Sequence, residues 1–366
     1  MLLAYRNLAQ DKTRLLLSTG GVALAILLIL VLNGFLSGIN QQITSYLDRT
    51  PGSILVAQRG VNNLLGATSL LPPGAAGQVA SVDGVERVIP ILSQFVILEL
   101  DGKKLPAFLV GYQPDQGGGP WQMASGRSPQ SDDELVFDQV LAQRHGIRLG
   151  SSMEILGEKF TVVGLSQNTT SWMASFFFLR KTAAERLLRA PGATSFLLVS
   201  LKPGAATQNV RQRLAELPGL DAWMKTTVAA NDLKLFAKVF SIPLKLMVAI
   251  AFLVGTLVVG LVIYTATVER QREYGALKAI GARNWMLYRV VAYQALSTSL
   301  AGAVGGVLLS SLAARWIMAA RPQFLVVITP YDALRVVAAG LAMALAAALV
   351  PARWIAGLAP ADVFRK

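Results

Sequence analysis

The side chains that most often carry chemistry in proteins are scarce in this sequence. Its 366 residues include no cysteine and a single histidine, His145. Thiol catalysis, zinc–thiolate sites, the usual histidine-based metal sites and a Ser-His-Asp triad therefore have almost no residues to draw on. The chain also lacks the GxxxxGK[ST] pattern of a nucleotide-binding loop. We predict a protein that is not an enzyme and has no catalytic, cofactor-binding or metal-binding residues of its own.

The remaining polar clusters have simpler interpretations. His145 precedes Gly146 and is interpreted as an ordinary residue at the end of a helix predicted over 133–145. The acidic run at 132–134 would begin that helix, where carboxylates complement the helix dipole, so capping is favoured over metal binding. The Asn-Thr-Thr sequence at 168–170 matches a glycosylation sequon, which matters only in a eukaryotic secretory pathway and otherwise arises by chance.

One loop is dense in charged, small and apolar residues, and reads ERQREYGALKAIGAR over 269–283. Its charges and an apolar face at Tyr274, Leu277 and Ile280 predict a short amphipathic helix at a membrane surface, ended by Gly281. Two interpretations are open from these residues alone. The loop is either a basic membrane anchor or a docking site for a cytoplasmic partner, because its two glutamates are not what an anionic membrane surface selects.

A membrane location follows from the composition and from four uncharged runs. The chain is 53% hydrophobic and only 15% charged, which is too apolar for an ordinary soluble protein of this size. A run of about 20 apolar residues spans the hydrocarbon core of a bilayer. Charge-free runs lie between Arg14 and Asp48, Lys245 and Glu269, Arg289 and Arg315, and Arg335 and Arg353. We predict four membrane-spanning helices, the first an uncleaved anchor. Their lack of Asp, Glu, Lys, Arg and His argues against an ion-coupled carrier.

The basic residues predict the orientation of these helices. Segments 1–14, 269–289 and 353–366 together hold eleven Lys and Arg, whereas the short loop between the third and fourth spans holds three. Because cytoplasmic loops are enriched in Lys and Arg, we expect both termini to be cytoplasmic and residues from about 48 to 240 to lie outside. The net charge of +13 is thereby assigned to the membrane and not to nucleic acid.

Between the first two spans the pattern changes to short alternating runs with turn residues. Hairpins are predicted over 95–112 and 152–165, and a helix over 207–217. This indicates a mixed α and β domain, built as one domain or as two small subdomains. Lysines and apolar residues alternate at helical spacing over 234–245, with Pro243 as a candidate kink. Together with the overlong first helix, this amphipathic helix suggests a stalk.

Small residues spaced by four occur within the predicted spans, as Gly34 with Gly38 and Gly302 with Gly306. Such pairs let helix backbones approach closely. Packing within the chain is favoured over a dimer seam.

At this point the sequence resembles the MacB/FtsX-type permeases of type VII ABC transporters. The loop ERQREYGALKAIGA carries the resemblance, together with AYRNLAQDKTRLLL, DELVFDQVLAQRHGIRLGSSMEILGEKFTVVGL and the closing LAPADVFRK. Within the family, the sequence is more similar to separate permeases that work with a periplasmic adaptor, such as those of the DevC kind. The resemblance implies a membrane α-helical fold with four spans in a 1+3 arrangement, a large inserted α+β extracytoplasmic domain and a helical stalk, in the bacterial cytoplasmic (inner) membrane.

The resemblance also implies that the loop is a coupling helix seated in a groove of a separate cytoplasmic ABC ATPase. ATP and Mg²⁺ would bind to that partner, with no cofactor in this chain and no fused ATPase domain. Further expected partners are a second permease copy, a periplasmic adaptor and the lipid bilayer, but no nucleic acid. The coupling residues carried over by position are Glu269, Arg270, Arg272, Glu273, Tyr274, Gly275, Leu277, Lys278, Ile280, Gly281 and Arg283.

The family's action is mechanotransmission, in which closure of the ATPase pair moves the external domains to export an amphiphilic or periplasmic substrate. The alternative is an FtsX-like signalling subunit that activates a periplasmic partner, such as a cell-wall hydrolase, without transport. The expected divisions are an N-terminal amphipathic helix (1–14), first span and stalk (15–47), MacB-like core domain (48–228), stalk and second span (229–268), coupling loop (269–289), third span (290–314), external loop (315–335), fourth span (336–352) and cytoplasmic C-terminus (353–366).

Overall fold

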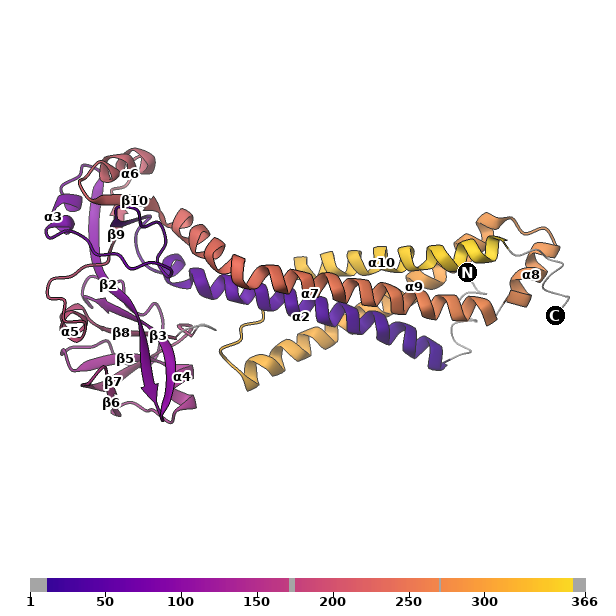
Figure 1. The fold of residues 1–366 in the computed structure, drawn as a ribbon, viewed down its shortest axis with the longest axis horizontal. Coiled ribbons are helices and arrows are strands. Elements are labelled where there is room, and N and C mark those ends of the chain that lie inside the picture. Colours follow the sequence, from indigo (N-terminus) through magenta and orange to yellow (C-terminus); the bar gives the residue numbers. More distant parts are fainter. Residues whose placement is uncertain (1–11, 171–174, 270, 358–366) are drawn as a thin grey trace. The chain divides into compact units, whose positions relative to one another are not determined.

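The computed structural model describes residues 12–170, 175–269 and 271–357 (Figure 1). These residues form two compact units. The helical unit comprises the described residues up to Gly38, residues 240–321 and the described residues from Leu325 onward, and the inserted unit comprises 39–239 with 322–324. Two helices, α2 (Lys12–Arg49) and α7 (Lys225–Glu269), contribute residues to both units.

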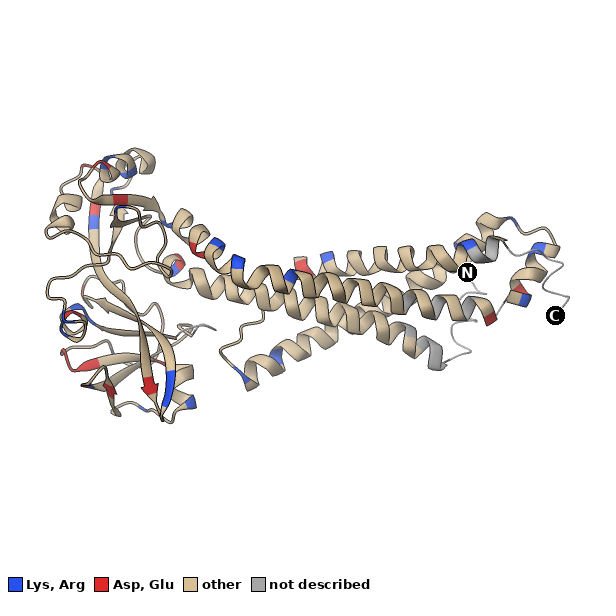
Figure 2. Cartoon of the chain, in the orientation of Figure 1, with Lys and Arg blue, Asp and Glu red and all other residues tan. Residues whose placement is uncertain are grey.

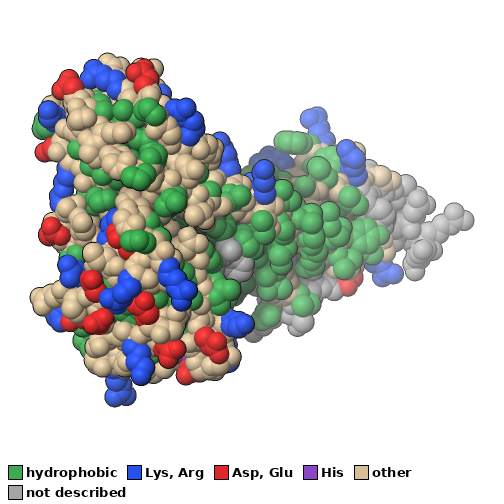
Figure 3. Space-filling model, turned by 60° about the vertical axis from the view of Figure 1, so that its left-hand side comes forward, with side chains coloured by type: hydrophobic (Ala, Val, Ile, Leu, Met, Phe, Trp, Pro, Cys, Tyr) green, Lys and Arg blue, Asp and Glu red, His purple; other side chains and the backbone are tan. Residues whose placement is uncertain are grey.

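Four helices of the described chain are long and apolar enough to cross a membrane: α2, α7, α9 (Asn284–Ala320) and α10 (Pro330–Gly357). The short helix α8 (Gln271–Ala279) lies between α7 and α9 in sequence. Large apolar side chains such as Leu300 and Leu308 are exposed on these helices, and Figure 3 shows apolar side chains covering much of their visible face. Such a surface is stable in lipid and not in water. The predicted 1+3 arrangement of four spans is confirmed.

Helix α9 approaches α2 closely at two glycines. A Cβ added to Gly302 would lie 2.6 Å from the Cβ of Val22, and one added to Gly306 would lie 2.8 Å from the carbonyl oxygen of Ala23. Neither position leaves room for a side chain without moving a helix. This pair of glycines therefore serves packing within the chain, as expected from its spacing.

The other glycine pair, on α2, contacts the segment that joins α9 to α10. The carbonyl oxygen of Gly34 accepts the N–H of Val327 at 2.9 Å. A Cβ on Gly38 would collide with the carbonyl group of Leu325. This pair also serves contacts within the helical unit.

Within the described inserted unit, ten strands form one sheet in the order β10-β1-β9-β2-β3-β8-β5-β7-β4, with β6 paired to β7. The strands are β1 (Ile54–Gln58), β2 (Val85–Leu100), β3 (Lys103–Tyr112), β4 (Met123–Gly126), β5 (Glu134–Asp138), β6 (Ser152–Ile155), β7 (Glu158–Ser166), β8 (Ser175–Arg180), β9 (Phe196–Leu201) and β10 (Leu220–Met224). The helices are α3 (Ala75–Ala80), α4 (Gln139–Arg144), α5 (Lys181–Leu187) and α6 (Thr207–Ala215). The expected α+β character is confirmed.

The long strand β2 belongs to two halves of this sheet. Its residues 85–91 pair with β9, and its residues 92–100 pair with β3. Helices α3 and α6 cover the first half with an apolar cluster that includes Val210. Helices α4 and α5 cover the second half with another cluster that includes Leu141. One sheet therefore carries two helix-covered cores, which combines the two organisations that the sequence left open.

A third cluster lies on the opposite face of both halves of the sheet, because side chains alternate along each strand. Leu109 and Phe177 belong to the cluster under α4 and α5, whereas their neighbours Phe108 and Phe176 belong to the third cluster. The third cluster also contains residues from the end of α2 and the start of α7, among them Tyr46. The sheet thus has helices on both faces, and one face receives the ends of the two helices shared by both units.

Both predicted hairpins are present. Strands β2 and β3 pair in antiparallel register, with Phe95 opposite Phe108, and β6 pairs with β7 across the turn at Leu156 and Gly157. The helix expected over 207–217 is α6, with its Val210 side buried.

The helix predicted over 133–145 is wrong in its first half. Residues Glu134–Asp138 form strand β5, between β7 and β8, and helix α4 begins only after Asp138. Four of the five residues of this strand are buried, and a fully buried strand shows no alternation by which to distinguish it from a helix. Asp138 is the true helix cap, since its carboxylate accepts the N–H of Leu141 at 2.9 Å.

The acidic run at 132–134 consequently does not cap a helix, and that prediction is also wrong. Glu134 forms a two-point ion pair with Arg127, with N–O distances of 2.6 and 2.7 Å. The other two carboxylates accept hydrogen bonds from Thr182 and Arg186 on α5. His145 does stand at the end of α4, where its Nδ1 lies 2.7 Å from a carboxylate oxygen of Asp101.

Candidate functional site

The loop singled out by the sequence folds as the helix α8, as predicted, followed by a tight turn. Gly281 has a φ of +94°, which an L side chain rarely adopts. Its N–H donates to the carbonyl oxygen of Lys278, and the next N–H, that of Ala282, donates to the carbonyl oxygen of Leu277. These hydrogen bonds satisfy carbonyl groups at the helix end, so a glycine here fixes where α8 ends and where α9 begins.

One side of α8 packs on the helical unit. Tyr274 is 5% exposed, and Gly275 beside it is also buried. Tyr274 belongs to an apolar cluster that includes Leu287 of α9 and Ala348 of α10, and Leu277 packs partly against the same cluster. These contacts hold α8 to the long helices, so Tyr274 and Gly275 do not present a free surface.

The other side of α8 and the following turn are open. The exposed members of the predicted coupling set are Glu269, Arg272, Glu273, Ile280, Gly281 and Arg283, while Lys278 is half-buried. Of the three residues expected on the apolar face, Ile280 is the one that does not pack on the helical unit, since it is 83% exposed. Helix α8 ends at Ala279, so Ile280 has left the helical spacing that aligns Tyr274 with Leu277. Arg270 lies outside the described residues, as do most of the predicted N-terminal helix and the end of the C-terminal segment.

The charges of the helical unit are concentrated at helix ends. In Figure 2 the middle stretches of the long helices are tan, and Lys, Arg, Asp and Glu reappear around α8 and the start of α9. An uncharged middle with charged ends is the pattern of helices that cross a bilayer and meet water at both sides. Helix α8 therefore lies at one of the two water-facing ends of the helical unit.

A second functional arrangement, which the sequence reasoning missed, attaches α2 and α7 to the sheet of the inserted unit. The Tyr46 hydroxyl near the end of α2 donates to the carbonyl oxygen of Gly118 at 2.6 Å. Its ring stacks on Phe176, with centroids 5.8 Å apart and planes 6° apart. The side chain of Lys225, at the start of α7, donates to the carbonyl oxygen of Thr50 at 2.6 Å. The two helix ends are thus joined to the sheet and to each other.

Asp232 completes this attachment. Its side chain is fully buried, and its carboxylate accepts the backbone N–H groups of Leu64 and Leu65 at 3.1 and 3.0 Å. Asn231 donates to the carbonyl oxygen of Asn62 at 2.9 Å. The loop after β1 is therefore fastened to α7. One signal in the sequence could have indicated this, because Asp232 is the only acidic residue between Lys225 and Glu269.

A buried carboxylate also stands inside the sheet. Burial raises the pKa of Asp138, while hydrogen bonds from Thr169 and from the N–H of Leu141 act in the opposite direction. Thr169 and Thr170 donate to this carboxylate at 2.7 and 2.8 Å. All of these partners belong to the helix cap and the neighbouring loop, which explains Asp138 as a structural residue.

Comparison with known proteins adds two family matches. Residues 15–217 match the model of the MacB-like periplasmic core domain, and residues 245–360 match the FtsX-like permease C-terminal model. An uncharacterized ABC transporter permease of Mycobacterium tuberculosis is 26% identical over 315 residues, which cover 85% of each chain.

A putative hemin transport system permease protein, HrtB, of Staphylococcus epidermidis is 19% identical over 290 residues, covering 77% of this chain and 76% of that protein. Among solved structures, the periplasmic region of MacB from Actinobacillus actinomycetemcomitans is 14% identical with a TM-score of 0.36, and the match covers 49% of this chain and 92% of that region.

Proposed function

The chain belongs to the MacB/FtsX-type ABC transporter permeases, and from this premise we propose that it couples ATP hydrolysis on a separate ATPase subunit to movement of its inserted domain. In this proposal α8 is the coupling helix, and ATP and Mg²⁺ bind to the ATPase. The helices cross a bacterial cytoplasmic membrane, with α8 and both termini on the cytoplasmic side and the inserted domain outside.

The observation that carries the proposal is that α8 is held firmly on one side and open on the other. A force applied to the exposed side would reach the long helices through Tyr274 and Gly275, because these residues are buried against them. Helices α2 and α7 each continue as one helix into the residues that fasten to the sheet. Packed helices transmit displacement because interiors are dense and poorly compressible.

The partners and substrate follow from the same proposal. The described residues of one permease provide four spans, and we infer a working unit of two permeases on a pair of ATPases, with a periplasmic adaptor for export across an outer membrane. The substrate in this proposal is an amphiphilic or periplasmic molecule. The uncharged runs contain no Asp, Glu, Lys, Arg or His with which to couple transport to ions. The hemin named for the staphylococcal relative is one such amphiphilic molecule.

The test of the coupling role uses the exposed face of α8. Ile280→Asp replaces an apolar side chain by a charged one. Because Ile280 is 83% exposed, the change should not disturb folding. We expect it to weaken association with the co-expressed P-loop ATPase by about tenfold, the effect of losing one interface anchor. Glu273→Arg should act in the same direction. Leu156→Asp, an exposed apolar position of the inserted unit, is the matched control and should bind normally. Unchanged ATPase association in both α8 variants would sink the assignment.

A signalling role is the second candidate, because the same architecture could activate a periplasmic partner without moving a substrate. The two functions separate in vesicles that contain the permease and its ATPase. Movement of an amphiphile that requires ATP supports export, whereas ATP-dependent activation of a cell-wall hydrolase with no substrate movement supports signalling.

A further inference from the structure

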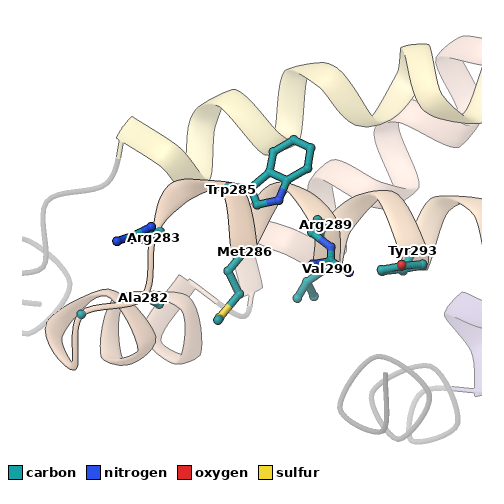
Figure 4. A pocket seen from close by; sticks show the side chains of 8 residues that line it. Ala282, Arg283, Trp285, Met286, Arg289, Val290 and Tyr293 are labelled. Atoms are coloured by element: carbon teal, nitrogen blue, oxygen red, sulfur yellow. The ribbon is translucent and has the colours of Figure 1, made fainter.

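A hollow opens at the junction between α8 and α9, within the helical unit. It has a volume of about 560 Å³ and is lined by Gly281, Ala282, Arg283, Trp285, Met286, Arg289, Val290 and Tyr293. Figure 4 shows that Met286, Arg289, Val290 and Tyr293 come from successive turns of the start of α9. The hollow shares Gly281 and Arg283 with the residues expected to contact the ATPase, and its other lining residues lie in the same turn and at the start of α9.

The lining combines two cations with aromatic and apolar groups. The guanidinium of Arg289 lies over the ring of Tyr293, 5.8 Å from its centroid. Within the described chain no carboxylate is recorded against Arg289 or Arg283. Trp285 and Met286 are 69% and 56% exposed. Cationic charge beside exposed apolar surface complements a ligand that is anionic at one end and apolar at the other.

The hollow continues into the apolar surface of α9. Tyr293 and Leu300 are spaced by seven residues, which places them on one face of the helix. Leu300, Val304 and Leu308 on this face are 54%, 57% and 61% exposed. A ligand with its charged end at the arginines could therefore lay its apolar part along about four turns of exposed α9.

We propose that this hollow binds the headgroup of an anionic phospholipid, whose acyl chains run along the exposed face of α9. Arginine at the end of a membrane helix attracts anionic lipids, and Trp and Tyr favour the same depth of the bilayer. The N-terminal segment of this chain is a poorer occupant, because Arg6, Lys12 and Arg14 give it the same sign of charge as the hollow. The choice of the cytoplasmic leaflet rests on the orientation in the proposed function.

The test measures lipid binding to the purified permease alone, by native mass spectrometry with added phosphatidylglycerol or phosphatidylcholine. We expect the double variant Arg283→Gln and Arg289→Gln to bind phosphatidylglycerol about thirtyfold more weakly, because it loses the attraction of two basic residues for an anionic lipid. The control removes the same charge from the other end of α9, as Arg315→Gln with Arg321→Gln, and should lose much less. Wild-type protein should prefer phosphatidylglycerol over phosphatidylcholine.

Met286→Glu provides a second variant, which adds a carboxylate to the hollow without removing an arginine and should also weaken binding. If the Arg283/Arg289 and Arg315/Arg321 variants lose the same affinity for phosphatidylglycerol, binding reflects general charge attraction and not this hollow, and the proposal is overturned. So would full displacement of the lipid by excess inorganic phosphate, because the apolar part would then contribute nothing. The proposal would also be overturned if a second permease copy covers the hollow in place of lipid, which native mass spectrometry would show as a permease dimer without bound lipid. ATPase binding is absent from this assay, so its failure leaves the coupling role intact.

Discussion

Asp232 is a single buried side chain that fastens the loop after β1 to α7. Its carboxylate accepts two backbone N–H groups from the loop after β1 and is fully buried. An acceptor removed from buried donors costs about 1 to 3 kcal/mol, because the donors lose their partner without regaining water.

We therefore expect Asp232→Ala to loosen the loop at Leu64 and Leu65 while leaving the rest of the sheet intact. Amide hydrogen exchange at these two residues should accelerate by about tenfold or more, corresponding to the loss of at least 1.4 kcal/mol of local stability. Asp232→Asn keeps one carbonyl oxygen as an acceptor and should show a smaller change. Exchange at Leu64 and Leu65 that does not respond to Asp232→Ala would contradict the role assigned to this residue.

Glu134 gives a prediction that depends on pH. The hydrogen bond from Arg127 lowers the pKa of Glu134 to about 2, with help from the N–H groups of Gln130 and Ser131. Because the pKa is lower in the folded state, the ion pair contributes stability above the ordinary pKa of 4.5, and this contribution is lost as the pH falls toward 2.

Wild-type protein should consequently have a higher Tm than Glu134→Gln at neutral pH, and the difference should shrink steadily as the pH is lowered through this window. Thermal unfolding followed at several pH values measures it. A Tm difference that stays constant with pH, or grows on acidification, would show that the carboxylate does not act through its charge.

At the scale of elements, the seam between α2 and α9 depends on where glycines stand. Gly302 and Gly306 have no room for a Cβ, whereas a Cβ on Gly305 of the same helix would meet its nearest neighbour at an ordinary 3.8 Å. These three positions share a helix and a residue type, so they differ chiefly in what they face.

Gly302→Ala and Gly306→Ala should each lower the Tm of the purified chain, because the added methyl group forces the two helices apart. Gly305→Ala is the matched control and should be neutral or slightly stabilising, since alanine favours a helix by up to about 1 kcal/mol over glycine. Thermal unfolding in detergent provides the measurement. A loss at Gly305 equal to that at Gly302 would point to a general effect of alanine and not to the seam.

The elements that could be predicted well from the sequence are those with a long and unambiguous pattern of residue types. Long apolar runs without charge, such as the one from Arg14 to Asp48, predict membrane helices, and turn residues between alternating runs predict the hairpin over 95–112. Short buried elements were harder. The centre of strand β5, residues 135–137, is apolar and shows no alternation, so the sequence does not distinguish this strand from the start of a helix.

The coupling loop shows the same contrast. Its helix and the glycine that ends it could be predicted, because both depend on local residues. Which of its residues face inward could not, because the burial of Tyr274 depends on Leu287 and Ala348, which come from two other helices. The attachment of Asp232 to Leu64 is likewise a contact between distant segments, and no local pattern specifies it.

At the scale of the whole molecule, the proposed function depends on three parts of the chain. In this proposal the ATPase binds the exposed side of α8 and the long helices cross the membrane, while the ends of α2 and α7 are fastened to the sheet by Tyr46, Lys225 and Asp232. The absence of cysteine makes this chain well suited to a distance measurement, since introduced cysteines are the only sites that a thiol-reactive spin label can modify.

The most direct test places labels at Leu149→Cys in the inserted unit and Tyr331→Cys on α10, both at exposed side chains, in permease bound to its ATPase. Pulsed electron spin resonance then gives the distance distribution between the labels with and without ATP and vanadate. We expect the distribution to shift when the nucleotide is trapped, and a smaller fraction of molecules to shift when Ile280→Asp is added, because this variant binds the ATPase about tenfold more weakly. A distribution that stays the same in an ATPase-bound, ATP-hydrolysing complex would contradict the claim that this chain transmits motion from α8 to the inserted domain.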